Sequence, residues 1–219
     1  MSRKSKKWAV LVGLLAVAGA GCTPSSLGWL LQDSKTKPEN PLPPKEGKRE
    51  VTVLVIVDQS KVAGDPMFMT AARDIAASIG TELVSETKDT RHPIVVVDRA
   101  KLERKQKELG DWRTVGPGAL GKQLGADYVI DASIDAISLY SKQDGNELFA
   151  GSADVTVDVY DTATPDVKMQ SYPHPSRQPQ TFKDGSPRTY CNRFLKRLGV
   201  EIARKHVPSD SNERMRRID

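Results

Sequence analysis

The sequence is poor in the residue types that most often build metal sites and covalent cross-links, with two cysteines and three histidines among 219 residues. Two cysteines exclude a disulfide scaffold and a four-cysteine zinc site. The histidines, His92, His174 and His206, are far apart in the chain and lack the spacing of metal ligands. We therefore expect neither a metal nor another cofactor.

A hydrophobic run that could span a membrane is also missing. The apolar stretch at residues 8–21 has 14 residues, whereas a membrane-spanning helix needs about 20. Four basic residues precede this stretch and small residues end it, which is the pattern of an export signal. We predict a signal peptide over residues 1–21.

Without the signal segment, the rest of the chain has almost no excess positive charge. The chain has 33 basic and 28 acidic side chains, and four of the basic ones, Arg3, Lys4, Lys6 and Lys7, belong to the signal, which leaves 29 against 28. Nucleic-acid-binding proteins need a strongly basic surface. Nucleic acid is therefore not an expected partner.

The signal ends in residues 19–22, Gly-Ala-Gly-Cys. This resembles a bacterial lipobox, which implies that Cys22 is acylated and anchors the mature protein to a membrane. The sequence departs from the pattern at Gly19, where a leucine is usual. Cleavage after residues 18–20, a small-x-small site that would release a soluble protein, stays open as an alternative. Thr23 replaces the acidic residue of an inner-membrane retention signal, which favours the outer membrane, facing the periplasm.

The rest of the chain divides into three parts. Residues 22–48 hold the cysteine and a proline-rich stretch with mixed charges, which predicts a tether. Residues 49–207 form a domain long enough to bury a core without cross-links. Residues 208–219 are expected to be a disordered tail.

The first half of the domain predicts a parallel β-α-β unit. Residues 51–57 and 93–97 are nearly continuous β-branched runs, as in strands buried on both faces. A helix is predicted to start at residues 65–66, Asp-Pro, and to join them by a right-handed crossover. Two more helices are predicted at 99–109 and near 119–124. The apolar stripe of the crossover helix consists of Phe68, Ala71, Ala72, Ile75 and Ile79.

The second half changes to a period of two. Residues 130–135 and 154–159 alternate apolar and polar, with Asp-Gly at 144–145 as a turn signal. A further strand at 167–172 and an amphipathic helix at 188–206 follow. The prediction is an α+β fold: a mixed sheet with a parallel β-α-β start and an antiparallel hairpin, flanked by helices and closed by a C-terminal amphipathic helix.

The domain resembles a known group of envelope proteins in residues 51–58, 95–99, 121–130 and 157–162. The group comprises curli-secretion lipoproteins of the CsgG type, penicillin-binding-protein activators of the LpoB type and the N-terminal domain of TolB. The resemblance covers about residues 51–162. It implies a mixed sheet flanked by helices that makes protein contacts and does not catalyse a reaction.

The hairpin poses an electrostatic problem. If it is centred on the turn signal, Asp135 lies opposite Asp154 and Asp131 lies opposite Asp158, and directly opposed like charges destabilise a sheet. A register shifted by two residues is the solution we favour. Basic side chains over the face, or a bound divalent cation, are the alternatives.

Other motifs have structural interpretations. Asp58 and Asp98 end the two parallel strands, where ligands bind in open α/β sheets, but a turn and a helix cap explain them. Residues 116–121 spell a nucleotide-binding glycine motif without the preceding strand that it requires. Cys191 falls on the apolar stripe of the last helix and is interpreted as a buried thiol.

A partner site is predicted around a proline-rich loop at 173–187 and the basic C-terminal helix. From residue 188 onward the chain has nine basic and four acidic side chains. The predicted contact residues are Tyr172, His174, Arg177, Phe182, Arg193 and Arg197.

We therefore expect a membrane-anchored envelope lipoprotein that binds other envelope proteins during assembly or secretion. One alternative is a ring-forming homo-oligomer similar to the curli-secretion lipoprotein. Another is an extracytoplasmic hydrolase using Asp58, Asp98 or His174, which is weaker because no set of nucleophile, base and orienting group can be named. We expect no catalytic residue and no enzymatic activity.

Overall fold

The computed structural model describes residues 35–62, 64–140, 149–178 and 186–210. By its contacts the chain divides into Met1–Lys35, of which only Lys35 is described, and a second unit, Thr36–Asp219. The five-stranded sheet and all the helices described below lie in the second unit. Cys22, the Asp-Gly turn signal and Phe182 lie outside the described residues.

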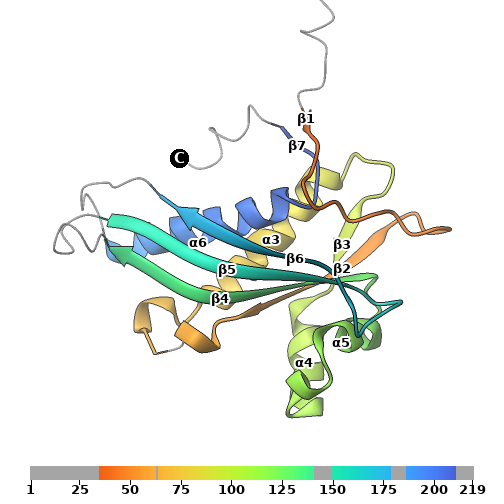
Figure 1. Cartoon of the computed structure of the whole chain (residues 1–219), viewed down its shortest axis with the longest axis horizontal. Coiled ribbons are helices and arrows are strands. Elements are labelled where there is room, and N and C mark those ends of the chain that lie inside the picture. Colours follow the sequence, from red (N-terminus) through yellow and green to blue (C-terminus); the bar gives the residue numbers. More distant parts are fainter. Residues whose placement is uncertain (1–34, 63, 141–148, 179–185, 211–219) are drawn as a thin grey trace, which may run out of the picture. The chain divides into compact units, whose positions relative to one another are not determined.

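A five-stranded mixed sheet forms the centre of the second unit, in the order β3-β2-β4-β5-β6 (Figure 1). β3, β2 and β4 are parallel, and β4, β5 and β6 are antiparallel to one another. The predicted parallel start and antiparallel pair are therefore confirmed. The strands are β2 (Val51–Asp58), β3 (Ile94–Val96), β4 (Tyr128–Tyr140), β5 (Phe149–Asp161) and β6 (Lys168–Arg177), and a separate pair consists of β1 (Lys35–Thr36) and β7 (Ser209–Asp210).

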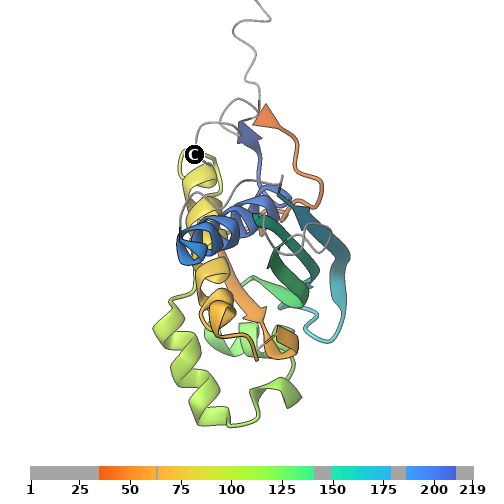
Figure 2. The same cartoon turned by 90° about the vertical axis from the view of Figure 1, so that its left-hand side faces the viewer.

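Helices cover both faces of this sheet. α3 and α6 pack on one face, and α4 and α5 contact the other face beside β2 and β4. Figure 2 shows α6 in blue crossing α3 in yellow, with α4 below them. The helices are α3 (Ala71–Thr87), α4 (Arg99–Leu109), α5 (Pro117–Leu124) and α6 (Pro187–Arg204), with short 3₁₀ turns η1 (Ser60–Val62), η2 (Pro66–Phe68) and η3 (Trp112–Thr114).

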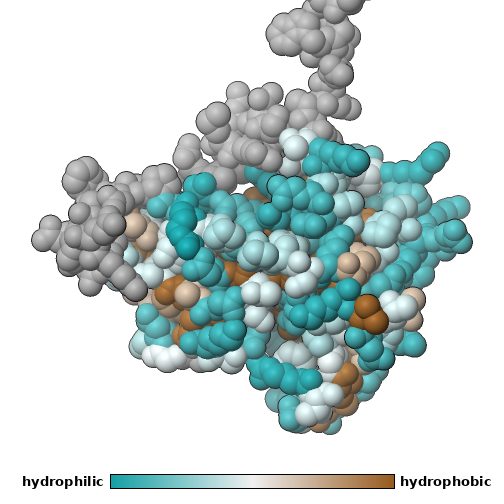
Figure 3. Space-filling view, viewed as in Figure 1, coloured by the Kyte–Doolittle hydropathy of each residue, from teal (hydrophilic) through white to brown (hydrophobic). Residues whose placement is uncertain are grey.

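The alternation of side chains along β2 explains why its sequence is nearly continuously apolar from Val53 to Val57. Val53 and Val55 point into the larger core under α3 and α6, whereas Leu54 and Ile56 point into a smaller core under α4 and α5. The run at 51–57 is therefore buried on both faces, as predicted. The surface seen in Figure 3 is mostly hydrophilic, with hydrophobic residues in small separate patches.

Two predicted boundaries are wrong. The helix expected from Asp65 begins only at Ala71, because Asp65 caps η2 by accepting a hydrogen bond from the Met67 N–H at 2.8 Å. The loop expected from 173 onward begins later, since β6 continues to Arg177 and pairs with β5.

The prolines of β6 are compatible with a strand because of their positions. Pro173 and Pro175 are two residues apart, so their nitrogens face the same side of the strand. Gln178, of the opposite parity, donates its N–H to the Gly151 carbonyl at 2.7 Å. The proline nitrogens therefore face away from β5, at the free edge of the sheet, where no N–H is needed.

None of the helices that the structure describes has the length and apolar content needed to cross a membrane.

Candidate protein-binding site

A groove of about 680 Å³ lies between α3 and α4, beside the end of β2. Its floor includes Val55, Ile56 and Val57, its α3 wall includes small side chains such as Ala76, and Trp112 of η3 also lines it. The lining is mainly apolar. The groove is therefore a surface that can bury hydrophobic groups of another molecule.

The groove exists because β3 is much shorter than β2. β3 pairs only with Val51–Val53, and the last contact is the hydrogen bond from the Val97 N–H to the Val53 carbonyl at 2.9 Å. The Asp98 side chain then accepts from the Ala100 N–H, starts α4 and directs the chain away from the sheet. The second half of β2 consequently has a neighbour, β4, on one side only.

The backbone of β2 alternates between its two neighbours. The Val51 N–H and the Val53 carbonyl form hydrogen bonds on the side of β3. The Thr52 carbonyl accepts from the Asp127 N–H on the other side, at the start of β4. By the same alternation the N–H and C=O groups of Val55 and Val57 face the groove. Within the described part of the chain, those four groups have no strand partner.

Two valines near the groove are unusually exposed for their type. Val84 on α3 lines the groove, Val95 belongs to the adjoining strand β3, and both have 42% of their surface accessible. On the α4 side, Arg99 and Glu103 pair with each other at 2.6 Å, so they add no net charge to the rim. The lining of the groove is thus mainly apolar and carries no net charge.

Sequence reasoning missed this groove. Its signal was the difference in length between the runs at 51–57 and 93–97, together with a helix cap directly after the second run. That difference predicts a partly unpaired strand only when the two runs are known to start in register.

The acidic face of the hairpin is the second candidate site. Asp131 does lie opposite Asp158, and a bulge between Ile134 and Ala136 places Ala136, and not Asp135, opposite Asp154. The favoured two-residue shift is therefore wrong.

Basic side chains supply most of the compensation on this face. Lys168 pairs with Asp158 at 2.7 Å, and Arg177 pairs with Asp154 at 2.6 Å. Lys61 reaches across from η1 to Asp135 at 2.5 Å. This is the second of the three solutions considered, supplied by the chain itself.

Asp131 is the carboxylate that these pairs leave least compensated. Burial and the neighbouring charges of Asp158 and Asp58 raise its pKa to about 6. No group of three potential metal ligands occurs among the described residues. On this face the carboxylates are therefore paired with basic side chains of the same chain, except Asp131, whose ionised form is disfavoured.

The predicted partner residues of β6 do not form one exposed patch. His174 is buried, with Nε2 3.7 Å from Glu201 Oε2 on α6. Tyr172 is half-buried and its hydroxyl lies 2.9 Å from His206 Nε2. Arg177 is exposed and pairs with Asp154.

The predicted basic residues of α6 differ in exposure. Arg193 is exposed, and Arg197 is half-buried and bonds Glu201 at 2.8 Å. Cys191 is buried, as expected, and burial raises the pKa of its thiol to about 11. A thiol of that pKa is a poor nucleophile at neutral pH.

The two strand-end aspartates act as the structural interpretation predicted. Asp58 accepts hydrogen bonds from the Ser60 N–H and hydroxyl and pairs with Arg113, and Asp98 caps α4. The glycine motif at 116–121 follows η3 and not a strand, and Gly116 has a φ of 82°, which glycine adopts easily.

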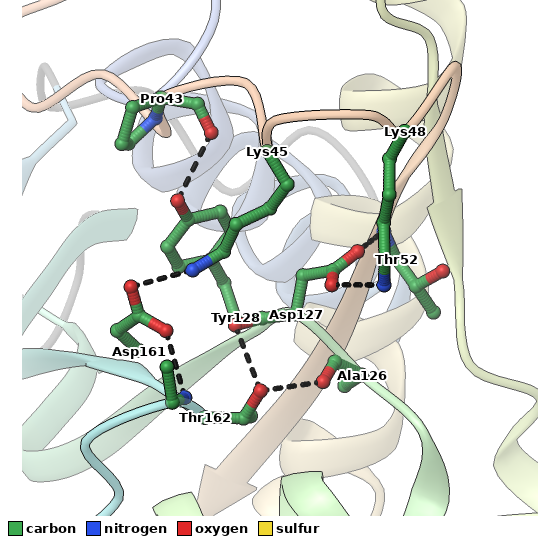
Figure 4. A network of polar contacts seen from close by, with 10 residues as sticks. Pro43, Lys45, Lys48, Thr52, Ala126, Asp127, Tyr128, Asp161 and Thr162 are labelled. Atoms are coloured by element: carbon green, nitrogen blue, oxygen red, sulfur yellow. Dashed lines mark hydrogen bonds and ion pairs between the residues drawn. The ribbon is translucent and has the colours of Figure 1, made fainter.

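Part of the predicted tether is held against the sheet. Residues 36–48, called the strap here, reach Asp127 through the Lys48 ammonium at 2.5 Å, and Asp127 also accepts from the Thr52 N–H at 2.9 Å (Figure 4). Lys45 pairs with Asp161 at 2.6 Å. Asp127 belongs to the Gly-Ala-Asp segment of the family resemblance, and here it serves a structural role.

The upstream half of the strap meets the end of α6. The Asn40 N–H donates to the Lys205 carbonyl at 2.7 Å, and Lys205 pairs with Glu39. Burial lowers the pKa of His206 to about 4, so its ring is neutral at pH 7. Because a carbonyl only accepts, His206 Nδ1 donates to Asn40 at 2.8 Å, and Nε2 accepts from the Tyr172 hydroxyl.

Comparison with known proteins gives similar structures but no family. No family model and no curated protein matches the chain, so the specific resemblance to CsgG, LpoB and TolB domains is not supported. The PelC dodecamer of Paraburkholderia phytofirmans is 9% identical, with a TM-score of 0.40 and 79% of this chain and 96% of that chain covered.

Two further solved structures are similar at the same level. The lipoprotein GNA1162 of Neisseria meningitidis is 15% identical, with a TM-score of 0.40 and coverage of 70% of this chain and 98% of that chain. The Xanthomonas campestris protein XCC0632, of family-model DUF330, is 10% identical, with a TM-score of 0.39 and coverage of 76% and 91%. This chain is thus similar to bacterial proteins that include a lipoprotein, at a level that transfers no function.

Proposed function

We propose that this protein is a membrane-anchored envelope lipoprotein that works as a protein-binding module in envelope assembly or secretion. The observation that carries the proposal is the apolar groove between α3 and α4, next to the free edge of β2. The anchor part rests on the basic, apolar and small-residue segments that end at Cys22. Its expected place is the outer membrane, facing the periplasm.

A binding role also accounts for the polar residues better than catalysis does. The three residues offered for a hydrolase have other partners: Asp58 holds a turn, Asp98 caps a helix, and His174 lies buried beside Glu201. A nucleophile needs a base within hydrogen-bond reach and access to a substrate. The proposal therefore assigns no enzymatic activity.

The anchor is tested by replacing its acylation site. In cells supplied with a clickable palmitate analogue, the full-length protein is expected to carry label and to sediment with membranes. A Cys22→Ser variant should lose the label and move to the soluble fraction. Equal labelling and sedimentation of both proteins would contradict acylation at Cys22.

The binding site is tested by photo-cross-linking in living cells. A photoreactive amino acid at Thr81, an exposed residue lining the groove, is compared with the same residue at Arg193, an exposed site from the sequence prediction. We expect a reproducible envelope protein linked through Thr81. Links through Arg193 alone would place the interface on α6, and self-linked species alone would favour a homo-oligomer.

A further inference from the structure

We infer that the partner enters the groove as an extended peptide that adds a short strand to the free edge of β2 at Val55–Val57. This inference rests on the proposed function for the statement that the groove binds a protein. It adds the form and chemistry of the segment that binds.

The backbone groups in the groove determine the form of the occupant. Val55 and Val57 together present two N–H and two C=O groups toward the position that β3 occupies further upstream. Residues two apart in a strand are roughly 6.6 Å apart, at about 3.3 Å per residue. An extended peptide offers its own N–H and C=O groups at the same interval, whereas a helix bonds its backbone internally.

The occupied part of the sheet already shows this arrangement. β3 occupies the position beside β2 up to the hydrogen bond between Val97 and Val53, and the chain leaves that position at Asp98. A partner strand would occupy the same position further along β2 and complete its pairing. Because β2 ends at Asp58, about three residues of the partner can pair, which suits a reversible contact rather than a permanent one.

The walls determine which side chains the peptide carries. Successive side chains of a strand point to opposite faces. One face of the added strand would meet Ala76 and Gly80 of α3, and the other would meet Leu102 of α4 and Trp112. The α3 wall is mainly apolar, and on the α4 wall the charged Arg99 and Glu103 pair with each other beside Leu102. The segment should therefore be uncharged and mainly apolar on both faces, as in a strand buried within a parallel sheet.

The first test needs only the free, full-length protein. Amide hydrogen exchange followed by NMR should be at least tenfold faster at Val55 and Val57 than at Leu54 and Ile56, whose N–H groups face β4. Equal protection at all four amides would mean that the groove side of β2 is already paired, and would overturn the inference.

The second test identifies the occupant with random eight-residue peptides displayed on phage. The full-length protein is compared with Ala77→Trp, which fills the groove from an exposed position of α3, and with Lys196→Trp, a matched change on α6. We expect enrichment of uncharged apolar peptides by the unmodified protein and by Lys196→Trp, but not by Ala77→Trp. Equal enrichment of the same peptides by Ala77→Trp and by the unmodified protein would overturn the inference.

Backbone pairing is then tested on the best enriched peptide. Two synthetic versions carry N-methyl groups on alternate amides, one on the odd and one on the even positions. Only one set of amides can face β2, so one version should lose at least tenfold in affinity and the other should bind nearly unchanged. Equal affinities of the two versions would overturn strand addition.

The outcomes separate the inference from the proposed function. Cross-linking through Thr81 with no effect of N-methylation, or with no groove-dependent peptide, would leave the protein-binding role standing and remove strand addition. Absence of both the Thr81 cross-link and any groove-dependent peptide would remove the proposed function itself. Peptides from this chain's own sequence would identify a second copy as the occupant.

Discussion

Among single residues, the half-buried Asp131 carries an unfavourable negative charge, because it lies opposite Asp158 in the neighbouring strand. Its pKa, raised to about 6, is above the unfolded value of 3.8. The carboxyl therefore stabilises the fold fully below about pH 4, and this contribution is lost as the pH rises through 6. We predict that Asp131→Asn raises the free energy of unfolding by about 1–2 kcal/mol at pH 7.5 and changes it little at pH 3.5.

Urea denaturation at the two pH values measures this difference. Asp135 is the matched control on the same strand, because the hydrogen bond from Lys61 lowers the pKa of that carboxyl. Asp135→Asn should not stabilise the protein at pH 7.5. A destabilised Asp131→Asn variant at neutral pH would show that the carboxylate is needed by the fold.

At the scale of elements, α6 is tied to β6 through Glu201. Burial alone would raise the pKa of Glu201, but His174, Arg197 and Ser176 around it hold the pKa at about 2. Because this value is below the unfolded 4.5, the stabilisation is complete above pH 4.5 and is lost as the pH falls toward 2. Glu201→Gln should cost about 1–3 kcal/mol at pH 7.

Chemical denaturation between pH 7 and pH 3 tests this contact. The difference between the unmodified protein and Glu201→Gln should shrink steadily below pH 4.5. A difference that stays constant over this range would mean that the variant acts through packing and not through the charge.

The crossing of α3 and α6 depends on a glycine. A methyl group at Gly199 would lie 2.6 Å from the Ser78 Cβ and 2.8 Å from the Ile75 carbonyl oxygen. Alanine is favoured over glycine in a helix by about 1 kcal/mol, but the backbone of α3 cannot yield easily. We therefore predict that Gly199→Ala destabilises the protein by about 1–3 kcal/mol, measured by thermal unfolding.

Gly64→Ala is the control for this substitution. A methyl group there would have no atom within 4 Å, so the melting temperature should stay the same or rise slightly. A rise for Gly199→Ala as well would contradict the close approach of the two helices.

Which elements could be predicted depended on whether the signal was local. The apolar run of β2 and the alternation in β4 and β5 predicted their burial. The register with Asp131 opposite Asp158 followed from the turn signal, but the prediction favoured a shift away from it, and that shift is wrong. The bulge near Asp135 was missed, although the inserted residue moves the core-facing positions of β4 from even numbers, ending at Ile134, to odd numbers, Ile137 and Leu139. The predicted strand ended too early, at residue 172, because prolines indicate a loop unless the strand is known to lie at the free edge of the sheet.

The candidate site was less predictable than the fold for the same reason. The groove depends on where β3 leaves β2, a relation between segments about 40 residues apart, and no single motif encodes it. The predicted contact residue His174 is buried because β6, absent from that part of the prediction, turns it toward α6. Contact roles for the exposed Arg177 and Arg193 stay predictions.

For the molecule as a whole, the strap adds stability to the sheet that it crosses. Asp127 is 5% exposed, and its charge is balanced by Lys48. We predict that the double variant Lys45→Ala, Lys48→Ala loses about 1–2 kcal/mol, because a buried carboxylate is left without its cation. That loss corresponds to a melting temperature lower by roughly 2–8 °C for a unit of this size.

Lys105→Ala is the matched control, since Lys105 forms an exposed pair with Glu108 on α4. Exposed pairs contribute little, so its melting temperature should change by less than about 2 °C. Equal effects of the two changes would mean that the strap adds no more than an ordinary surface contact.

The strap also sets the path that mechanical force takes through the protein. If the chain upstream of Thr36 is held at a membrane while a partner pulls on the groove, tension reaches the pairing of Thr36 with β7 first. It then reaches the contacts of Glu39 and Asn40 with the end of α6, next Lys45 and Lys48, and only then β2. Contacts loaded in sequence along a chain open one at a time. Under load the strap would therefore detach from the sheet step by step and lengthen the tether between the membrane and the domain. The sheet that holds the partner would stay folded meanwhile.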